Sequence, residues 1–329
     1  MPQGVEVQVL SSAAMENLFA SCPQNWLMSN VPLEEMLRTQ TYPLFIKFHG
    51  WPELSLRDID TPEVTHWYRE GTEIQPDFSN PRFPWFPNNA LLMEMLGTFQ
   101  AGKSSLIEHF LSKQGESSVK FIEEPFFSIP QGLMSVEMLP PEYGEDEFLH
   151  SFHDRSWFNV FDTQQVKIRN WINTVQLLSK GNSKPDDVWI GYRGPIDTLC
   201  WIYTYACHKI EDEFFVVPEF RESFEKWAKA CIGEMCVFSA KSSAIVMMGI
   251  SQEEAIARRR KAGKTYMSYS ETPIYNELSA WYGFFIRNVY PRLRESYGTG
   301  LLILDGERST DYNVERLKRY LLEVRSVIG

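Results

Sequence analysis

The sequence predicts an α/β fold, in which one parallel sheet of five strands carries helices on both faces. First, short apolar runs alternate with stretches of helical periodicity along residues 90–329, a pattern typical of parallel sheets covered on both sides. Second, the first apolar run leads directly into a glycine-rich loop and then a helical stretch. Third, 43% of the 329 residues are hydrophobic, which is enough for a well-filled core.

Five apolar segments are the expected strands, in chain order 90–96, 119–125, 187–195, 243–251 and 300–307. A long helix is expected over residues 155–180, where large apolar side chains recur at helical spacing until Gly181. A closing amphipathic helix is expected from the apolar positions between Val314 and Ile328. Ligands of such sheets bind at the carboxyl ends of the strands. Functional residues are therefore expected in the segments that follow the strands.

A proline-rich segment divides the chain. Residues 76–87 read PDFSNPRFPWFP, with four prolines among four aromatic residues. Proline at this density prevents a helix interior or a central strand, which predicts an extended connector packed by its rings. The predicted division is an N-terminal extension of uncertain structure and role (1–75), the connector (76–89) and the domain that carries the site (90–329).

Composition narrows the possible partners. A formal net charge of -11 disfavours a nucleic-acid-binding surface. The five cysteines form no CxxC pair, so reduced, buried thiols and a cytoplasmic location are expected. The six histidines lack HxxxH or HExxH spacing, which predicts no zinc site. No apolar run is long enough to cross a membrane, so no membrane partner is expected. The sequence leaves the oligomeric state open, with a homodimer as one alternative.

The run G-T-F-Q-A-G-K-S at residues 97–104 is the clearest functional signal. Its two glycines let the backbone curl so that successive N–H groups point at phosphate oxygens. The lysine adds a positive charge, the serine offers a hydroxyl to magnesium, and the following helix adds its positive N-terminal end. We therefore predict a site for ATP and Mg²⁺. The candidate ATP ligands are Gly97, Gln100, Ala101, Gly102, Lys103, Ser104 and Ser105, with Ser104 as the magnesium ligand.

A cationic segment follows the fourth expected strand. Ser251 and Glu254 form the capping box S-x-x-E, so a helix is expected to begin at Ser251. Arg258, Arg259 and Arg260 lie along its next turns, and steps of about 100° let at most two of them face one phosphate chain. Guanidinium groups suit bidentate contact with phosphate. Arg259 is the candidate catalytic arginine, and the two residues beside it are candidate ATP ligands. The alternative is a solvated basic face.

The segments after the strands resemble, in order, those of the deoxynucleoside kinase and thymidylate kinase-like family of P-loop phosphotransferases. The resemblance covers about residues 90–329 and includes the glycine loop. Four further segments carry it: FIEEPF is similar to the family's Glu-Pro segment, YRGPIDTLCW to its Asp-Arg-Gly or Glu-Arg-Ser segment, ISQEEAIARRRKAGK to the segment leading into its arginine-rich lid, and LDGERSTDYNVERL to the loop beside the nucleotide base. It implies a P-loop kinase-like three-layer fold and an ATP-dependent phosphotransferase acting on a nucleoside or nucleotide.

The resemblance also implies roles for single residues. Glu124 takes the position of the carboxylate that accepts the proton of an acceptor hydroxyl. Arg193 aligns with the arginine of the third-strand segment, as a catalytic and substrate-binding residue. Gln164 and Gln165 lie on the long helix, where this family often contacts the substrate base with a glutamine amide. The alternatives are an exposed acidic turn for Glu124 and a solvated helix face for the glutamines.

At one position the sequence departs from the family pattern. An acidic residue that helps to hold magnesium usually precedes the arginine aligned with Arg193, but Tyr192 stands here. A phenol stays neutral at pH 7 and supplies no negative charge. We expect another carboxylate to hold the metal, with Glu123, Glu124 and Asp197 as candidates, although Asp197 has the alternative role of capping the next helix. The competing hypothesis is a P-loop NTP-binding protein with lost or redirected kinase chemistry that regulates a partner.

Overall fold

The computed structural model describes residues 51–52, 60–113, 119–122, 187–192, 194–207, 239–263 and 273–328, with single positions between 171 and 184 and at 228. Its strands are β1 (Glu73–Ile74), β2 (Leu91–Gly97), β3 (Val119–Ile122), β4 (Val188–Tyr192), β5 (Ala244–Gly249) and β6 (Gly300–Asp305). Its helices are η1 (Trp67–Glu70), η2 (Pro87–Asn89), α3 (Lys103–Lys113), α6 (Pro195–Cys207), α9 (Gln252–Lys261), α10 (Ile274–Phe284), the π-helical η7 (Phe285–Val289), α11 (Tyr290–Tyr297) and α12 (Thr310–Ile328).

The strands form one sheet in the order β1-β6-β5-β2-β4-β3. The five strands from β2 to β6 run parallel, which confirms the predicted parallel sheet. The sixth strand, β1, was not predicted; it pairs antiparallel with β6 at the sheet edge. Because β2 lies between β5 and β4, the chain leaves β2 at the centre of the carboxyl edge, where ligands bind in open α/β sheets.

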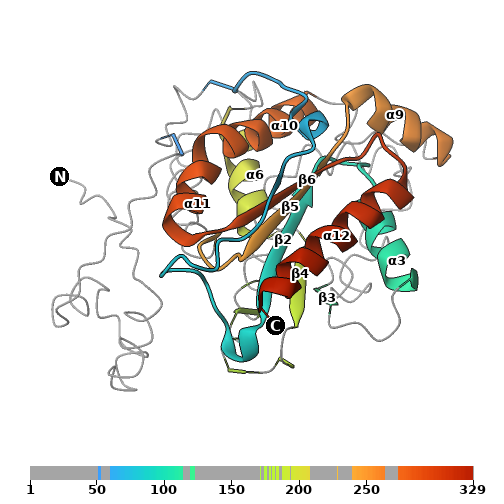
Figure 1. The fold of residues 1–329 in the computed structure, drawn as a ribbon. Coiled ribbons are helices and arrows are strands. Elements are labelled where there is room, and N and C mark those ends of the chain that lie inside the picture. Colours follow the sequence, from blue (N-terminus) through green and yellow to red (C-terminus); the bar gives the residue numbers. More distant parts are fainter. Residues whose placement is uncertain are drawn as a thin grey trace, which may run out of the picture.

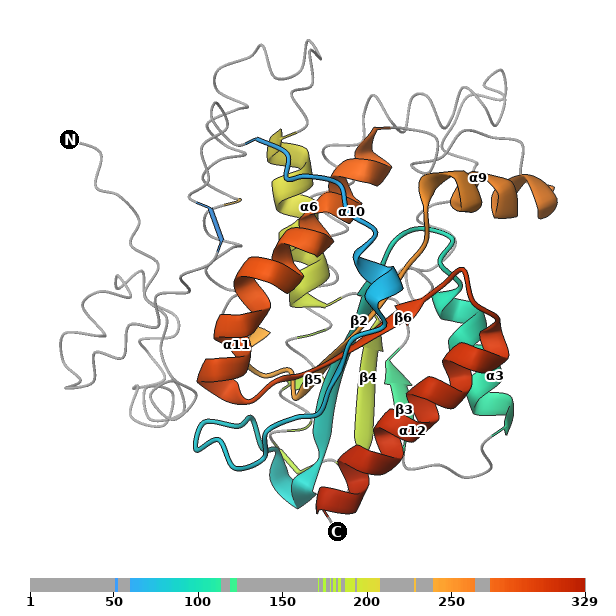
Figure 2. The ribbon, with the colours of Figure 1, turned by 45° about the horizontal axis from the view of Figure 1, so that its top comes forward.

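Helices cover both faces of the sheet, which gives the predicted three layers (Figures 1 and 2). One core joins α3 and α12 to side chains such as Met93 and Met95 of β2, and a second joins α6, α10 and α11 to side chains such as Leu96. All residues of β2 and of β5 are buried. Strands buried on both sides are apolar throughout rather than alternating, which explains why these two strands appear in the sequence as short apolar runs.

One predicted segment differs from the structure, and a second is described only in part. The segment 187–195 was expected to be one strand, but β4 ends at Tyr192 and α6 begins at Pro195. Proline suits the first helical position because its missing N–H is not needed there. The long helix predicted over 155–180 is described only in part: Trp171, Val175 and Leu178 are helical and buried. Thr174 is also helical and Lys180 lies in a turn, and the other positions of the predicted helix lie outside the described residues.

The described part of the N-terminal extension packs onto the same sheet. Trp67 and Tyr68 of η1 are buried in the core beside α10, and β1 follows directly. In the connector, the ring of Phe83 lies 4.9 Å from that of Phe78 and 4.8 Å from that of Trp85, measured between centroids. Residues 1–50 lie outside the described residues, and the division of the chain at residues 75 and 89 stays a prediction.

Two cysteines fall within the described residues. Cys200 and Cys207 of α6 are both free and buried, as expected for reduced thiols. Burial raises the pKa of the Cys200 thiol well above its ordinary value and that of Cys207 to about 12. Neither thiol is therefore a reactive thiolate near neutral pH. Across the described parts of the chain, no helix has both the length and the apolar character required to span a membrane.

Candidate functional site

The glycine loop leaves the central strand at a position that only glycine fits. Gly97 has a φ of 140°, and a Cβ atom there would lie 1.8 Å from the carbonyl oxygen of Met248. The loop is then fixed to the end of β5 by two hydrogen bonds. The backbone N–H of Thr98 donates to the Met248 carbonyl at 3.1 Å, and the Ile250 N–H donates to the Thr98 hydroxyl at 3.0 Å. The curled backbone that the sequence predicts for the glycine loop is thus held in place by the pairing of β2 with β5.

Lys103 begins α3 and directs its charge into the loop. Its side chain is 3% exposed, and its Nζ donates to the carbonyl oxygens of Gly97 at 2.9 Å and Thr98 at 2.5 Å. Ser104 and Ser105 are exposed in the same first turn, which contains no acidic residue. A positive charge, a helix N-terminus and curled backbone together form a setting that favours phosphate.

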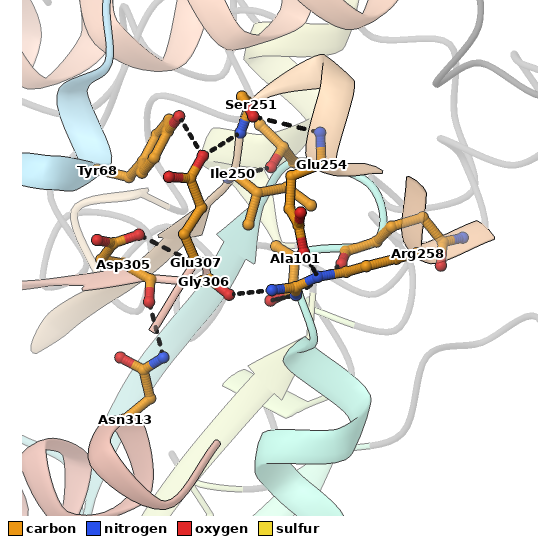
Figure 3. A network of polar contacts seen from close by, with 12 residues as sticks. Tyr68, Ala101, Ile250, Ser251, Glu254, Arg258, Asp305, Gly306, Glu307 and Asn313 are labelled. Carbon is orange, nitrogen blue, oxygen red and sulfur yellow. Dashed lines mark hydrogen bonds and ion pairs between the residues drawn. The ribbon is translucent and has the colours of Figure 1, made fainter. Parts of the chain in front are cut away.

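The helix start predicted at Ser251 is confirmed, but only half of the capping box forms, because the Ser251 N–H donates to Glu307 rather than to Glu254. The Ser251 hydroxyl accepts the backbone N–H of Glu254 at 3.3 Å, and α9 follows from the next residue. The Glu254 carboxylate accepts from Arg258 Nε at 2.7 Å, four residues further along the helix. Figure 3 shows the Arg258 guanidinium reaching back to the glycine loop: it donates to the carbonyls of Gln100 at 3.3 Å and Ala101 at 3.5 Å.

The three consecutive arginines lie in different surroundings, as the helical spacing predicts. Arg258 contacts the glycine loop and the Gly306 carbonyl, the latter at 2.6 Å. Arg259 is 3% exposed, whereas Arg260 is exposed to solvent. Arg258 therefore lies next to the glycine loop, where its guanidinium donates hydrogen bonds to backbone carbonyls. The phosphate contacts assigned to all three arginines stay predictions.

A buried acid that sequence reasoning missed lies behind the loop. Glu94 in β2 is fully buried, and its carboxylate accepts the backbone N–H groups of Ile196 at 3.2 Å and Asp197 at 3.0 Å. These N–H groups belong to the first turn of α6, so Glu94 caps that helix. A single acid inside the otherwise apolar LLMEMLG was the available signal, because a buried carboxylate needs partners.

Asp197 itself is fully buried in the first turn of α6. Its carboxylate accepts the Tyr282 hydroxyl at 2.5 Å, and the same hydroxyl lies 3.5 Å from the Gly97 carbonyl oxygen. Tyr282 therefore links Asp197 to the first residue of the glycine loop. Asp197 lies close to the site that the sequence predicted, but behind the loop, within the core between the sheet and α10.

The stability of the protein should depend on pH through Glu94. Desolvation raises the pKa of Glu94 to about 8, against the opposing effect of the Asp197 and Ile196 N–H groups. A carboxyl group whose pKa is raised on folding contributes stability that is present below its ordinary value of 4.5 and lost as pH rises through about 8. The free energy of unfolding should therefore fall by roughly 1 kcal/mol for each pH unit crossed between these values.

We therefore expect Glu94→Gln to flatten the decline in the free energy of unfolding between about pH 5 and about pH 8. Urea denaturation at both pH values measures this, and Glu315→Gln on the exposed face of α12 is the control that should retain the wild-type slope. If Glu94→Gln and the wild type show the same pH dependence of stability, the raised pKa assigned to Glu94 is wrong.

Glu307, just after β6, is a second unpredicted acid at this edge. Its carboxylate accepts hydrogen bonds from the Tyr68 hydroxyl and the Arg69 guanidinium, both at 3.0 Å, and from the Ser251 N–H at 3.1 Å. Desolvation alone would raise its pKa, but the Ser251 N–H, Arg69 and Tyr68 together lower the pKa to about 2. Glu307 is therefore ionised at neutral pH and binds three separate donors.

Several predicted site residues cannot be placed. Glu123, Glu124, Gln164, Gln165 and Arg193 lie outside the described residues. Within the parts of the chain that are described, no three His, Cys, Asp or Glu side chains gather as a metal site.

Tyr192 is the last residue of β4, so the predicted departure from the family pattern lies at the carboxyl edge. The segment around it is closely packed, because the Trp171 ring would lie 2.4 Å from a Cβ on Gly191 and 2.8 Å from one on Gly194.

The strand order and the glycine loop are consistent with a P-loop kinase fold. The sequence matches no known family description, and no curated protein matches it. Among solved structures, the chain is similar to deoxyadenosine kinase from M. mycoides with bound dATP, at 18% identity and a TM-score of 0.40, over 70% of this chain and 98% of that one. The glycine loop and the strand order carry the assignment of the candidate site.

Proposed function

We propose that the protein is an ATP-dependent phosphotransferase that acts on a nucleoside or nucleotide at the carboxyl edge of the sheet. The observation that carries this proposal is the glycine loop: Lys103, at the start of α3, directs its ammonium group against the carbonyls of Gly97 and Thr98. An ammonium group held inside a curled backbone, at a helix N-terminus, matches the charge of a triphosphate. The acceptor is a small molecule, and we place the reaction in the cytoplasm.

The proposed chemistry needs positioning and charge neutralisation, since phosphoryl transfer requires little covalent work from the protein. Lys103 holds the phosphates, Arg259 neutralises the moving group, and Glu124 accepts the proton of an acceptor hydroxyl. Arg193 orients the acceptor. Together these side chains bind, orient and deprotonate the reactants.

Mg²⁺, when bound, neutralises charge on the phosphate oxygens. The exposed Ser104 hydroxyl in the first turn of α3 fits a magnesium ligand. Of the three carboxylates considered for the metal (Glu123, Glu124 and Asp197), we favour Glu124 over Asp197, because Asp197 is fully buried and accepts a hydrogen bond from Tyr282.

The experiment that tests the proposal is a panel of nucleosides and nucleoside monophosphates incubated with the purified protein, ATP and magnesium. ADP release that depends on one class of acceptor supports the proposal and names that class. ATP binding is followed separately as a rise in melting temperature. If no acceptor is turned over, this second measurement still shows whether the protein has a phosphate site. A protein that neither binds ATP nor releases ADP would rule the proposal out.

A second candidate function is supported by two observations. Tyr192 ends β4 where the family pattern has an acid, and residues from the N-terminal extension pack into the core beside α10. Both fit a P-loop NTP-binding protein whose kinase chemistry has been lost or redirected and whose nucleotide state controls a partner. In that protein ATP would bind, but no acceptor would be phosphorylated.

Tyr192→Asp separates the two candidates. We expect it to leave magnesium-dependent ADP formation unchanged or lower, because another carboxylate already holds the metal and an added charge beside it is repulsive. Tyr192→Phe, which keeps the ring and removes only the hydroxyl, is the matched control. A wild-type protein inert on every acceptor, with turnover created by Tyr192→Asp but not by Tyr192→Phe, would favour the second candidate.

A further inference from the structure

The 3₁₀ helix η1 packs against the carboxyl end of β5. Its Trp67 and Tyr68 side chains are 2% and 1% exposed. They occupy the space left by Gly249, where a Cβ atom would lie 2.8 Å from the Tyr68 ring and 2.9 Å from that of Trp67. The Trp67 indole N–H also donates to the Ser279 hydroxyl of α10 at 3.2 Å. Ring packing and the Trp67 hydrogen bond therefore hold η1 against β5 and α10 without the contacts of Tyr68 and Arg69 to Glu307.

The polar atoms of η1 converge on Glu307. The Tyr68 hydroxyl donates to Glu307 Oε1 and the Arg69 guanidinium to Oε2, both at 3.0 Å. Oε1 also accepts the backbone N–H of Ser251, the residue that caps α9. Figure 3 shows this carboxylate between Tyr68 and the start of α9. One ionised group thus joins the N-terminal extension to the helix that carries the three arginines.

The neighbouring residue continues this connection to the glycine loop. The Gly306 carbonyl accepts from Arg258 at 2.6 Å, and Arg258 also donates to the carbonyls of Gln100 and Ala101. The loop after β6 lies so close that a Cβ on Gly306 would be 2.7 Å from the Ala101 oxygen. The glycine loop, α9 and the residues after β6 therefore meet, and η1 is bonded to the same segment through Glu307.

We propose that η1 is a positioning element for the ATP site: Tyr68 and Arg69, acting through Glu307, hold the start of α9 and thereby Arg258 against the glycine loop. This inference rests on the proposed function, since the site that is positioned is the ATP site. Binding groups that are held in place before the ligand arrives lose less conformational freedom on binding. Loosening the Glu307 contact allows α9 and the loop to separate, and ATP binding then has to restore their arrangement.

Tyr68→Phe tests this directly, because it removes the hydroxyl and keeps the packed ring. We expect faster amide hydrogen exchange in the first turns of α9 in the ligand-free protein. We also expect ATP affinity to fall by about tenfold, the change equivalent to one hydrogen bond to a charged acceptor. The matched control is Tyr290→Phe, which also removes a tyrosine hydroxyl, bonded to the Thr299 carbonyl at 3.0 Å just before β6 begins. It should change neither measurement.

A double-mutant cycle separates positioning from a general loss of stability. If η1 acts through Arg258, Tyr68→Phe should cost little further ATP affinity in an Arg258→Ala background, so the two effects should not add. Unchanged exchange in α9, wild-type ATP affinity in Tyr68→Phe, or fully additive effects would each overturn the inference. A wild-type protein that binds no ATP would overturn the proposed function, and the inference with it, before any variant is made.

Discussion

Lys103→Ala is expected to weaken ATP binding by at least about tenfold and to remove turnover, because a hydrogen bond between charged groups contributes about 1.5–3 kcal/mol. In the structure the Lys103 ammonium lies within hydrogen-bonding distance of two loop carbonyls, from where it can move to the oxygens of a triphosphate. The fold should survive, since alanine is a good helix former and the lysine occupies the first position of α3. Calorimetric titration with ATP and magnesium measures the affinity, and a melting curve confirms folding.

The control is Lys318→Ala on α12, which removes the same charge from a side chain that pairs with Glu315. It leaves the overall charge identical to that of Lys103→Ala, so any difference between the two variants reports the site rather than long-range electrostatics. Wild-type ATP affinity in a folded Lys103→Ala protein would contradict the assignment of the glycine loop.

Gly97→Ala is expected to lower the free energy of unfolding by about 3 kcal/mol or more, the range for strained or overpacked buried positions. The added methyl group would lie 1.8 Å from the Met248 carbonyl oxygen, and the φ of 140° disfavours any side chain. Neither strand can easily move away, because Gly97 and Met248 are register partners at the centre of the sheet. Urea denaturation followed by circular dichroism measures the change.

Gly263→Ala is the matched control for this substitution. Its φ of 69° is also unfavourable for alanine, but no atom lies within 4 Å of the added methyl group. Backbone strain alone should therefore cost about 1–2 kcal/mol. Equal destabilisation by the two substitutions would show that the approach of Met248 to the loop is not the constraint at Gly97.

The parallel strands and the glycine loop could be predicted because their signals are local. Strands β2 and β5 are buried on both faces and therefore appear as apolar runs. The helix at Ser251 was marked by its own capping box. The helices α10 and α11 were missed. Eight of the eleven residues of α10 are buried, so its sequence lacks the apolar stripe by which an amphipathic helix is found.

The contacts that build the site could not be predicted from residues that are neighbours in the sequence. Glu307 meets Tyr68 across 239 positions of sequence, and Glu94 meets Asp197 across 103. Such pairs depend on the strand order, which residue types and spacing do not specify. The sequence did predict the helix that begins at Ser251 and carries Arg258. Its bonds to backbone carbonyls could not be foreseen, because carbonyl acceptors look the same in every residue.

The antiparallel pairing of β1 with β6 bears on whether the 90–329 region is separable. A chain starting at residue 90 would leave the outer backbone groups of β6 unpaired, and an unprotected strand edge is a template for association with other chains. It would also uncover the surface beneath Trp67 and Tyr68, which are almost fully buried. Exposed apolar surface of this kind promotes aggregation. Residues 60–75 therefore belong with residues 90–329 whenever the protein is shortened. A loss of solubility on their removal would say nothing about the proposed phosphate site.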